Sequence, residues 1–139
     1  MLYKNKKTIG MPVVSLDDGR QLGQIKRLLI DPQTMVVAAF TIDRKGWFKE
    51  QSVIPYSHLK NVGSHAVTVD QAQAVVKLSS LPELEVLAKK TPPLLNVRVI
   101  TEEGIILGTV SDFYFDPQDG KINSLEIKKG LFFSTRILD

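Results

Sequence analysis

The chain has 139 residues and a mass of 15.5 kDa, with 43% hydrophobic residues, 24% charged residues and a formal net charge of +3. These fractions are close to the globular average, which excludes a disordered, collagen-like or coiled-coil chain. The absence of cysteine excludes disulfides, thiolate metal sites and cysteine nucleophiles, and it suits a reducing compartment.

The first third of the chain has the pattern of β-strands joined by tight turns. A short strand is expected at 13–16, and the turn at 17–20 contains Gly19, which can supply the positive φ of a tight hairpin. A longer strand is expected at 21–30, with Gly23 at a position where a strand would bulge or bend.

The chain then reverses in a type I turn. Pro32 presets φ at the second position of this turn, and Asp31 can bond the backbone from the first. The β-branched and aromatic residues of 35–43 predict a third strand. The later elements are a loop at 44–49, a strand at 51–54, a helical turn at 56–60 and a strand at 66–69.

A short helix is expected farther along the chain. Ser80 stands three residues before Glu83, as in a capping box, and Pro82 lies in the first turn, where its missing donor costs nothing. Apolar residues at helical spacing follow, and a Thr-Pro-Pro sequence ends the helix. The preceding stretch, 71–78, is compatible with either a strand or irregular chain.

An internal repeat organises the sequence at an offset of 85 residues. Without a gap, eight of the 30 positions from 13 to 42 are identical to the residue 85 positions later. The pattern therefore predicts a duplication. Its parts are a first domain at 9–70, a linker with a short helix at 71–94, and a second, incomplete domain at 95–139.

The alternation of apolar and polar residues predicts strands in both copies and identifies the side chains that face the core. Helices at 21–30 or 106–115 would contradict this prediction. The side chains expected to be mostly buried are Leu22, Ile25, Leu28, Val37, Ile42, Leu107, Val110, Phe113, Leu125 and Ile127.

The ordered motifs of the repeat resemble the PRC-barrel family. In the first copy they are the acidic turn with Gly19, Leu22-Gly23-x-Ile25, Asp31-Pro32 and Val53-Ile54-Pro55-Tyr56. In the second copy they are Glu103-Gly104, Leu107-Gly108-x-Val110, Asp116-Pro117 and Gly120. The family includes the cytoplasmic domain of the photosynthetic reaction-centre H subunit and the C-terminal half of a ribosome maturation factor.

The resemblance implies an all-β fold. Two tandem small PRC-type β-barrels would be joined by a short helix, and the second barrel would be truncated. The family supplies no catalytic residues to carry over, so the resemblance implies a docking module and not an enzyme.

The residues of the chain also give little support to catalysis. The two histidines, His58 and His65, have no nucleophile or carboxylate at a motif spacing, so we expect surface or capping roles for them. The pairs Asp17-Asp18 and Glu102-Glu103 resemble the paired carboxylates of glycosidases, but solvated acidic residues are normal in hairpin turns. No catalytic residue is predicted.

Metal and phosphate sites are not predicted either. Asp112, Asp116 and Asp119 are spaced by four and three residues, which does not match the alternate ligands of an EF-hand. We expect Asp112 to face outward from its strand. Gly19 and Gly23 lack the lysine and hydroxyl residue that end a P-loop, so no cofactor is expected.

Two loops at equivalent positions combine basic residues, a glycine and large apolar side chains. Such combinations are typical of interface hot spots, although Trp47 or Phe48 could instead fill the end of a barrel. The candidate partner-binding residues are Arg44, Lys45, Trp47, Phe48, Lys129, Leu131, Phe132 and Phe133.

Basic residues are concentrated in the first half of the chain. Residues 1–70 carry 10 basic and 6 acidic side chains, and residues 71–139 carry 8 and 9. This mild polarity suits an anionic partner, although ordinary solvated charge also explains it. The candidate basic patch consists of Lys4, Lys6, Lys7, Lys26 and Arg27.

The sequence thus predicts a non-enzymatic interaction module that docks onto a larger protein or ribonucleoprotein assembly. The alternative is direct binding of ribosomal RNA or an anionic membrane surface through the basic first domain. The longest apolar run, Met35 to Phe40, is far shorter than the roughly 20 residues of a membrane-spanning helix. Because no apolar segment follows the basic N-terminus as in a signal peptide, we expect a bacterial-type cytoplasmic protein.

The second copy stops where the first still has a helical turn and a strand to come. A barrel without its closing strand would expose backbone edges, which folded proteins usually pair or cover. The expected covers are the N-terminal residues 2–8, residues 71–78, or the same edge of another chain in a homodimer.

Overall fold

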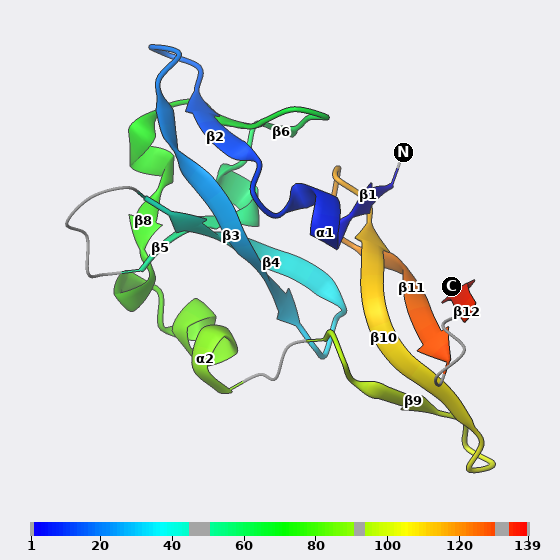
Figure 1. Ribbon diagram of the computed structural model, residues 1–139. Coiled ribbons are helices and arrows are strands. Elements are labelled where there is room, and N and C mark those ends of the chain that lie inside the picture. Colours follow the sequence, from blue (N-terminus) through cyan, green and yellow to red (C-terminus); the bar gives the residue numbers. More distant parts are fainter. Residues whose placement is uncertain (1, 45–50, 91–93, 130–133, 139) are drawn as a thin grey trace.

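The computed structural model describes residues 2–44, 51–90, 94–129 and 134–138 of the chain. These residues form two β-sheets with short helical segments between the strands (Figure 1). The predicted linker helix is present as α2 (Pro82–Lys90), and a single helical turn, α1 (Asn5–Thr8), lies near the N-terminus. The 3-10 turns are η1 (Tyr56–His58), η2 (Ala72–Ala74) and η3 (Leu78–Ser80).

The first sheet has seven strands in the order β6-β7-β2-β3-β4-β5-β8. Its strands pair antiparallel except for β7, which runs parallel to β2. Within the described ranges no pairing joins β6 to β8, so this sheet does not close into a ring. The strands are β2 (Pro12–Ser15), β3 (Gln21–Asp31), β4 (Val36–Asp43), β5 (Ser52–Pro55), β6 (Asn61–Val62), β7 (Val67–Val69) and β8 (Val76–Lys77).

The second sheet has five strands, with β1-β10-β11-β12 in order and β9 paired to β10. Both β1 and β9 lie along the same edge of β10, because Tyr3 pairs with Phe115 at one end and Ile100 with Ile106 at the other. The strands are β1 (Tyr3–Lys4), β9 (Arg98–Ile100), β10 (Ile106–Phe115), β11 (Ile122–Lys129) and β12 (Ser134–Leu138). Of the expected covers, residues 2–8 supply β1, which pairs with β10 and leaves the outer edge of β9 without a strand among the described residues, whereas β8, from the stretch 71–78, pairs with β5 of the first sheet.

The four strands β9 to β12 repeat the pairing of β2 to β5. The long strands β3 and β10 carry register shifts at equivalent places, between Ile25 and Arg27 in one and between Val110 and Asp112 in the other. The regions 21–30 and 106–115 are strands, as the alternation of apolar residues predicted. The duplication in the sequence is thus a duplication of structure.

Close approach of the backbone explains the repeated glycine in the long strands. A Cβ atom on Gly23 would lie 2.7 Å from the carbonyl oxygen of Asp43. A Cβ atom on Gly108 would collide with the carbonyl oxygen of Lys128, the residue equivalent to Asp43. The predicted bend therefore needs glycine for space as well as for backbone freedom.

The constant offset of 85 is wrong for the first strand of the repeat. Val13 pairs with Gly23, and its structural equivalent, the partner of Gly108, is Val99, at an offset of 86. The hairpin turn accounts for the change. Four residues separate Ser15 from its hydrogen-bond partner Arg20, whereas three residues separate Thr101 from Ile105.

The two copies share one hydrophobic core. Phe40 of the first copy and Phe115 of the second are both fully buried, with their ring centroids 6.3 Å apart in an edge-to-face arrangement. Of the ten side chains predicted to be buried, eight are buried, and Leu107 and Leu125 are half-buried. A common core predicts that the two copies unfold together.

A backbone bridge between the copies lies on an approximate two-fold axis. Val36 bridges Lys121, and the amide of Val37 donates to the carbonyl of Gly120 at 2.8 Å. The equivalent bond with the copies exchanged is also present, since the amide of Ile122 donates to the carbonyl of Met35 at 3.0 Å. The starts of β4 and β11 are thereby fixed side by side.

The segment that precedes each copy in the chain packs against the other copy. The N-terminal β1 and α1 lie on β10, as Figure 1 shows, and α2, which precedes the second copy, lies against β3. The α2 contact has its own small core, in which Leu84 packs with Leu29 and Ala39. These two packing contacts join the copies at two further places.

A substitution at Gly120 tests the backbone bridge between the copies. Its φ is +78°, and an added Cβ atom would lie 2.9 Å from the Val37 carbonyl oxygen and 3.3 Å from the Tyr56 ring. Gly104 has a similar φ of +88° but open space around it. We expect Gly120→Ala to lower the free energy of unfolding by about 2 to 4 kcal/mol, and Gly104→Ala by about 1 kcal/mol.

Urea unfolding of both variants measures the difference. The wild-type chain should unfold in a single transition because the core is shared. Equal losses in the two variants, or two separate wild-type transitions, would show that the bridge does not couple the copies.

Candidate functional site

The two loops predicted to bind a partner follow equivalent strands, β4 and β11. Arg44 is the only candidate of the first loop among the described residues, and its Nε donates to the carbonyl of Leu22 at 3.3 Å. The backbone of Lys129 pairs with Ser134 at the end of β11. The other candidates lie outside the described residues: Lys45, Trp47, Phe48, Leu131, Phe132 and Phe133.

The predicted basic patch is divided by structural roles. The Lys4 ammonium forms an ion pair of 3.1 Å with Glu126, and this bond raises the pKa of Lys4 above its usual value. The Arg27 guanidinium donates to the carbonyl of Ala88 at 3.1 Å. The Lys6, Lys7 and Lys26 side chains are exposed.

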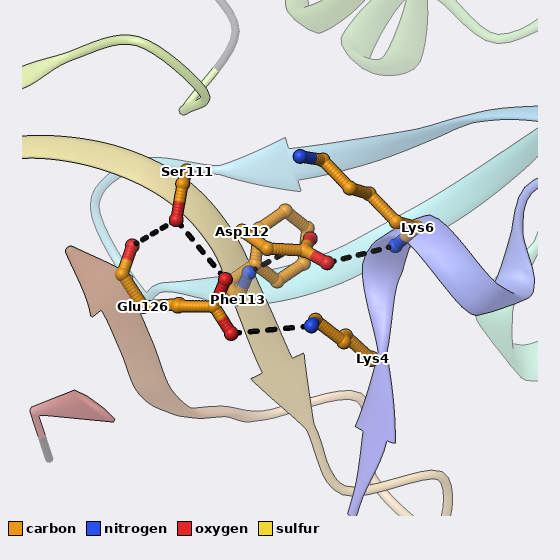
Figure 2. A network of polar contacts seen from close by, with 6 residues as sticks. All are labelled: Lys4, Lys6, Ser111, Asp112, Phe113 and Glu126. Carbon is orange, nitrogen blue, oxygen red and sulfur yellow. Dashed lines mark hydrogen bonds and ion pairs between the residues drawn. The ribbon is translucent and has the colours of Figure 1, made fainter. Parts of the chain in front are cut away.

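The expectation that Asp112 faces outward is wrong. Its side chain is fully buried beneath the N-terminal segment, where the amide of Lys6 donates to Oδ2 at 3.3 Å (Figure 2). The amide of Phe113 donates to Oδ1 at 2.9 Å. Because both carboxylate oxygens accept bonds, the polar side chain is tolerated in the interior.

Asp112 and Arg27 occupy equivalent positions in the two copies. Asp112 accepts from an amide in the first turn of α1, whereas Arg27 donates to a carbonyl in the last turn of α2. Helices leave amides without partners at their start and carbonyls without partners at their end. Each copy therefore carries the charge that suits the helix end packed against it.

The remaining acidic residues of the motifs serve turns. The amide of Gln33 donates to Asp31 and the amide of Gln118 to Asp116, each at 2.9 Å, as the predicted turns require. The amide of Arg20 donates to Asp18 in the hairpin turn and lowers the pKa of that carboxyl. Hydrogen bonds to these carboxylates thus belong to the local backbone.

The described part of the chain shows no cluster of side chains that could hold a metal ion. Among its residues, no three histidine or acidic side chains come together where they could hold an ion. A cavity of about 80 Å³ lies between β3, α1 and the segment after α2, lined mainly by apolar side chains. This cavity is smaller than the roughly 300 Å³ or more of ordinary ligand pockets. Two hollows that lie more open to solvent are larger, one of about 530 Å³ beside Gly23 and Arg44 and one of about 570 Å³ between Tyr56 and Gln118.

An exposed apolar cluster stands on the hairpin of β9 and β10. Ile100 and Ile106 pair across the two strands, and each is 54% exposed. Ile105, in the turn, is 59% exposed, and Val97 is 40% exposed. In Figure 1 this hairpin projects away from the first sheet, on the opposite side of the molecule from the hairpin of β2 and β3. We call Ile100, Ile105 and Ile106, which lie together at the end of this hairpin, the isoleucine cluster.

The sequence interpretation missed the isoleucine cluster. Its signal is a difference between the copies, because the residues equivalent to Ile105 and Ile106 are Arg20 and Gln21. These two positions of the hairpin are polar in the first copy and apolar in the second, and their side chains are exposed in both. Exposed apolar clusters of this kind are typical of interaction surfaces.

Comparison with protein families decides which fold this duplication represents. The model of the PRC-barrel domain matches residues 3–76 and 92–138, which include most of both sheets. The chain belongs to the PRC-barrel domain family. No curated protein matches the chain.

The PRC-barrel match assigns β1 and α1 to the first segment although these elements pack on the second. It leaves residues 77–91, which contain α2, between the segments. The family is one of generally non-catalytic domains, in agreement with the motifs of the chain. In the ranges that the structure describes, no helix is long and apolar enough to cross a membrane.

Tyr56 of the PRC-barrel motif joins the two copies. Its hydroxyl donates to the carbonyl of Pro117 at 2.6 Å, and its ring packs edge-to-face on Phe40 at 5.8 Å. Burial raises the pKa of the Tyr56 phenol well above its usual value, and the negative charges of Asp119 and Asp116 raise it further. Tyr56 thus remains a neutral donor.

The titration of Tyr56 gives a pH prediction. Its raised pKa contributes stability that is fully present below the pKa of an unfolded tyrosine, about 10, and is lost as the pH rises above it. Tyr56→Phe should cost about 1 kcal/mol at neutral pH and reduce the loss of stability above pH 10. Urea unfolding from neutral to alkaline pH checks this, and an unchanged alkaline slope in the variant would contradict it.

Proposed function

We propose that this PRC-barrel protein is a non-enzymatic interaction module that docks onto a larger protein or ribonucleoprotein assembly in the cytoplasm. Its units would be a first domain at 9–70, a linker at 71–94 and a second domain at 95–139. The family match supports a β-barrel form for these units. The observation that carries the proposal is the exposed isoleucine cluster.

Burial of the isoleucine cluster would supply binding energy. Removing an isoleucine side chain fully from water is worth about 1.5 to 3 kcal/mol. Ile105 and Ile106 are each more than half exposed, so a partner can gain much of this energy from them. A few such side chains usually carry most of the affinity of an interface.

The loops after β4 and β11 remain candidate anchors. Arg44 and Lys45 with Trp47 and Phe48, and Lys129 with Leu131, Phe132 and Phe133, combine apolar and basic groups. A homodimer through the edge of the second copy is the corresponding proposal for self-association. These surfaces would enlarge the contact made by the isoleucine cluster.

The alternative proposal is a contact with ribosomal RNA or an anionic membrane surface. The observation in its favour is the exposure of Lys6, Lys7 and Lys26 on the first half of the chain. A contact with phosphates weakens steeply as salt rises, whereas an apolar contact is nearly independent of salt. Recovery of the partner at low and at high salt therefore distinguishes the two proposals.

Charged substitutions test the isoleucine cluster. Ile105→Lys should abolish recovery of the partner with the tagged protein from its native cells and change the free energy of unfolding by about 0.5 kcal/mol or less. Leu16→Lys is the matched control, because Leu16 is 53% exposed and lies on the opposite hairpin. Equal recovery with Ile105→Lys and with wild type would remove the cluster from the docking surface.

Trp47→Ala tests the first loop in the same assay. If Trp47 docks a partner, the variant should lose the partner and keep its thermal stability within about 1 kcal/mol. A large loss of stability would instead identify Trp47 as a core residue.

A further inference from the structure

We propose that the outer edge of β9 accepts an extended segment of the partner protein as a parallel β-strand. The partner segment would alternate apolar β-branched residues, with an acidic residue at its start and a basic residue at its end. This inference rests on the proposed docking function and names the chemistry of the partner.

The first copy shows how this edge is covered. In the first sheet β7 runs parallel to β2, pairing Val67 with Val13 and Val69 with Ser15. The ladder continues beyond β2, where the amide of Leu16 donates to the carbonyl of Val69 at 2.9 Å. Val13 and Ser15 are fully buried under this arrangement. The repeat unit therefore has a built position for a parallel strand.

In the described part of the second copy, no strand pairs with the same edge. Val99 and Thr101 are the equivalents of Val13 and Ser15, and both are partly exposed. Among the residues that the structure describes, β9 pairs only with β10. Unpaired strand edges are ready templates for another strand, and adding one is a common mode of peptide recognition.

The direction of the backbone groups in β9 follows from the hairpin. The amide of Thr101 donates to the carbonyl of Ile105 and so points toward β10. Backbone groups alternate along a strand, so the amide and carbonyl of Ile100 point to the free edge. Ile100 is the equivalent of Val14, which faces Thr68 of β7 in the first copy. Its backbone is thus the anchor for an added strand.

The side chains beside the edge define the partner. Ile100 and Ile106 form an exposed pair next to the edge, where an apolar β-branched side chain of the added strand would pack. Exposed Arg98 starts β9, and exposed Glu102 and Glu103 follow it. A parallel segment therefore matches these charges when it begins with an acidic residue and ends with a basic one.

A designed peptide probes the edge directly. A capped peptide of sequence Glu-Val-Thr-Val-Lys, which carries the core of β7, is titrated into the isotope-labelled full chain. We expect saturable shifts of the amide signals of residues 98–101 and of Ile105 and Ile106. The same peptide with a methyl group on the amide of the second valine, the equivalent of Val69 whose backbone faces β2 in the first copy, cannot complete the ladder and should bind at least tenfold more weakly. Absence of shifts at 98–101, or equal binding of the methylated peptide, would overturn the proposal.

A peptide with the order of charges reversed, Lys-Val-Thr-Val-Glu, tests the direction of the added strand. It matches Arg98 and the two glutamates only when it runs antiparallel to β9. Tighter binding of this peptide would overturn the parallel arrangement.

Variants of the chain give a second measurement. Ile100→Pro removes the amide that faces the free edge and leaves the Thr101 bond to β10 in place, so it should abolish peptide binding. Ile100→Thr keeps the amide and β propensity and should weaken binding only severalfold, which keeps the test valid if the proline variant does not fold. Equal binding by wild type and a folded Ile100→Pro variant would overturn the proposal.

The two sets of experiments distinguish a failure of the proposed docking function from a failure of the proposed strand addition. Loss of the cellular partner with Ile105→Lys, without any binding of the peptides, would retain the docking surface and overturn the strand addition. Peptide binding with full partner recovery by Ile105→Lys would retain the edge and overturn the isoleucine cluster as the docking surface. Dimerisation in sedimentation that Ile100→Pro abolishes would place a second copy on the edge and overturn the partner strand.

Discussion

The backbone bridge between Val36 and Lys121 is the contact on which the rest of the structure depends. It places β4 and β11 side by side about an approximate two-fold axis, so that both copies direct their apolar faces into one core. Each copy alone has about the size at which burial becomes marginal. Phe40 and Phe115 illustrate the gain, since both are fully buried and their rings pack against each other across the two copies. Duplication has thus produced one core of adequate size from two small sheets.

The segment that precedes each copy packs against the other copy, and this explains why the copies differ at equivalent positions. The strand residue that meets a neighbouring helical segment is an acid in one copy and a base in the other, because Asp112 meets the start of α1 and Arg27 the end of α2. The Lys4 ion pair with Glu126 adds a second polar contact under the N-terminal segment (Figure 2). Divergence at these sites therefore follows the polarity of the helix ends.

Local features of the fold could be predicted from the sequence, and contacts between distant segments could not. The turns at Asp31 and Asp116, the long strands and α2 depend on neighbouring residues, which is why turn signals and helical spacing identified them. The predicted capping box is wrong in detail, because the Ser80 hydroxyl donates to the carbonyl of Lys77 at the start of the preceding 3-10 turn at 2.7 Å. The burial of Asp112 depends on Lys6, 106 residues away, and no local pattern indicates that contact. The isoleucine cluster was visible only as a difference between the copies, and comparison of identical residues alone passes over it.

Because the two copies share one core, a partner bound to one copy would also stabilise the other. A ligand that binds only the folded state stabilises every element that unfolds with its site, by an amount set by its concentration and affinity. Strand β10, which carries β9 at its edge, contributes Phe113 and Phe115 to the same core as β4 and β5 of the first copy. Binding of a partner to the second copy would therefore slow amide hydrogen exchange in the buried strands of the first copy. Thermodynamic linkage produces this effect without any change in the folded structure.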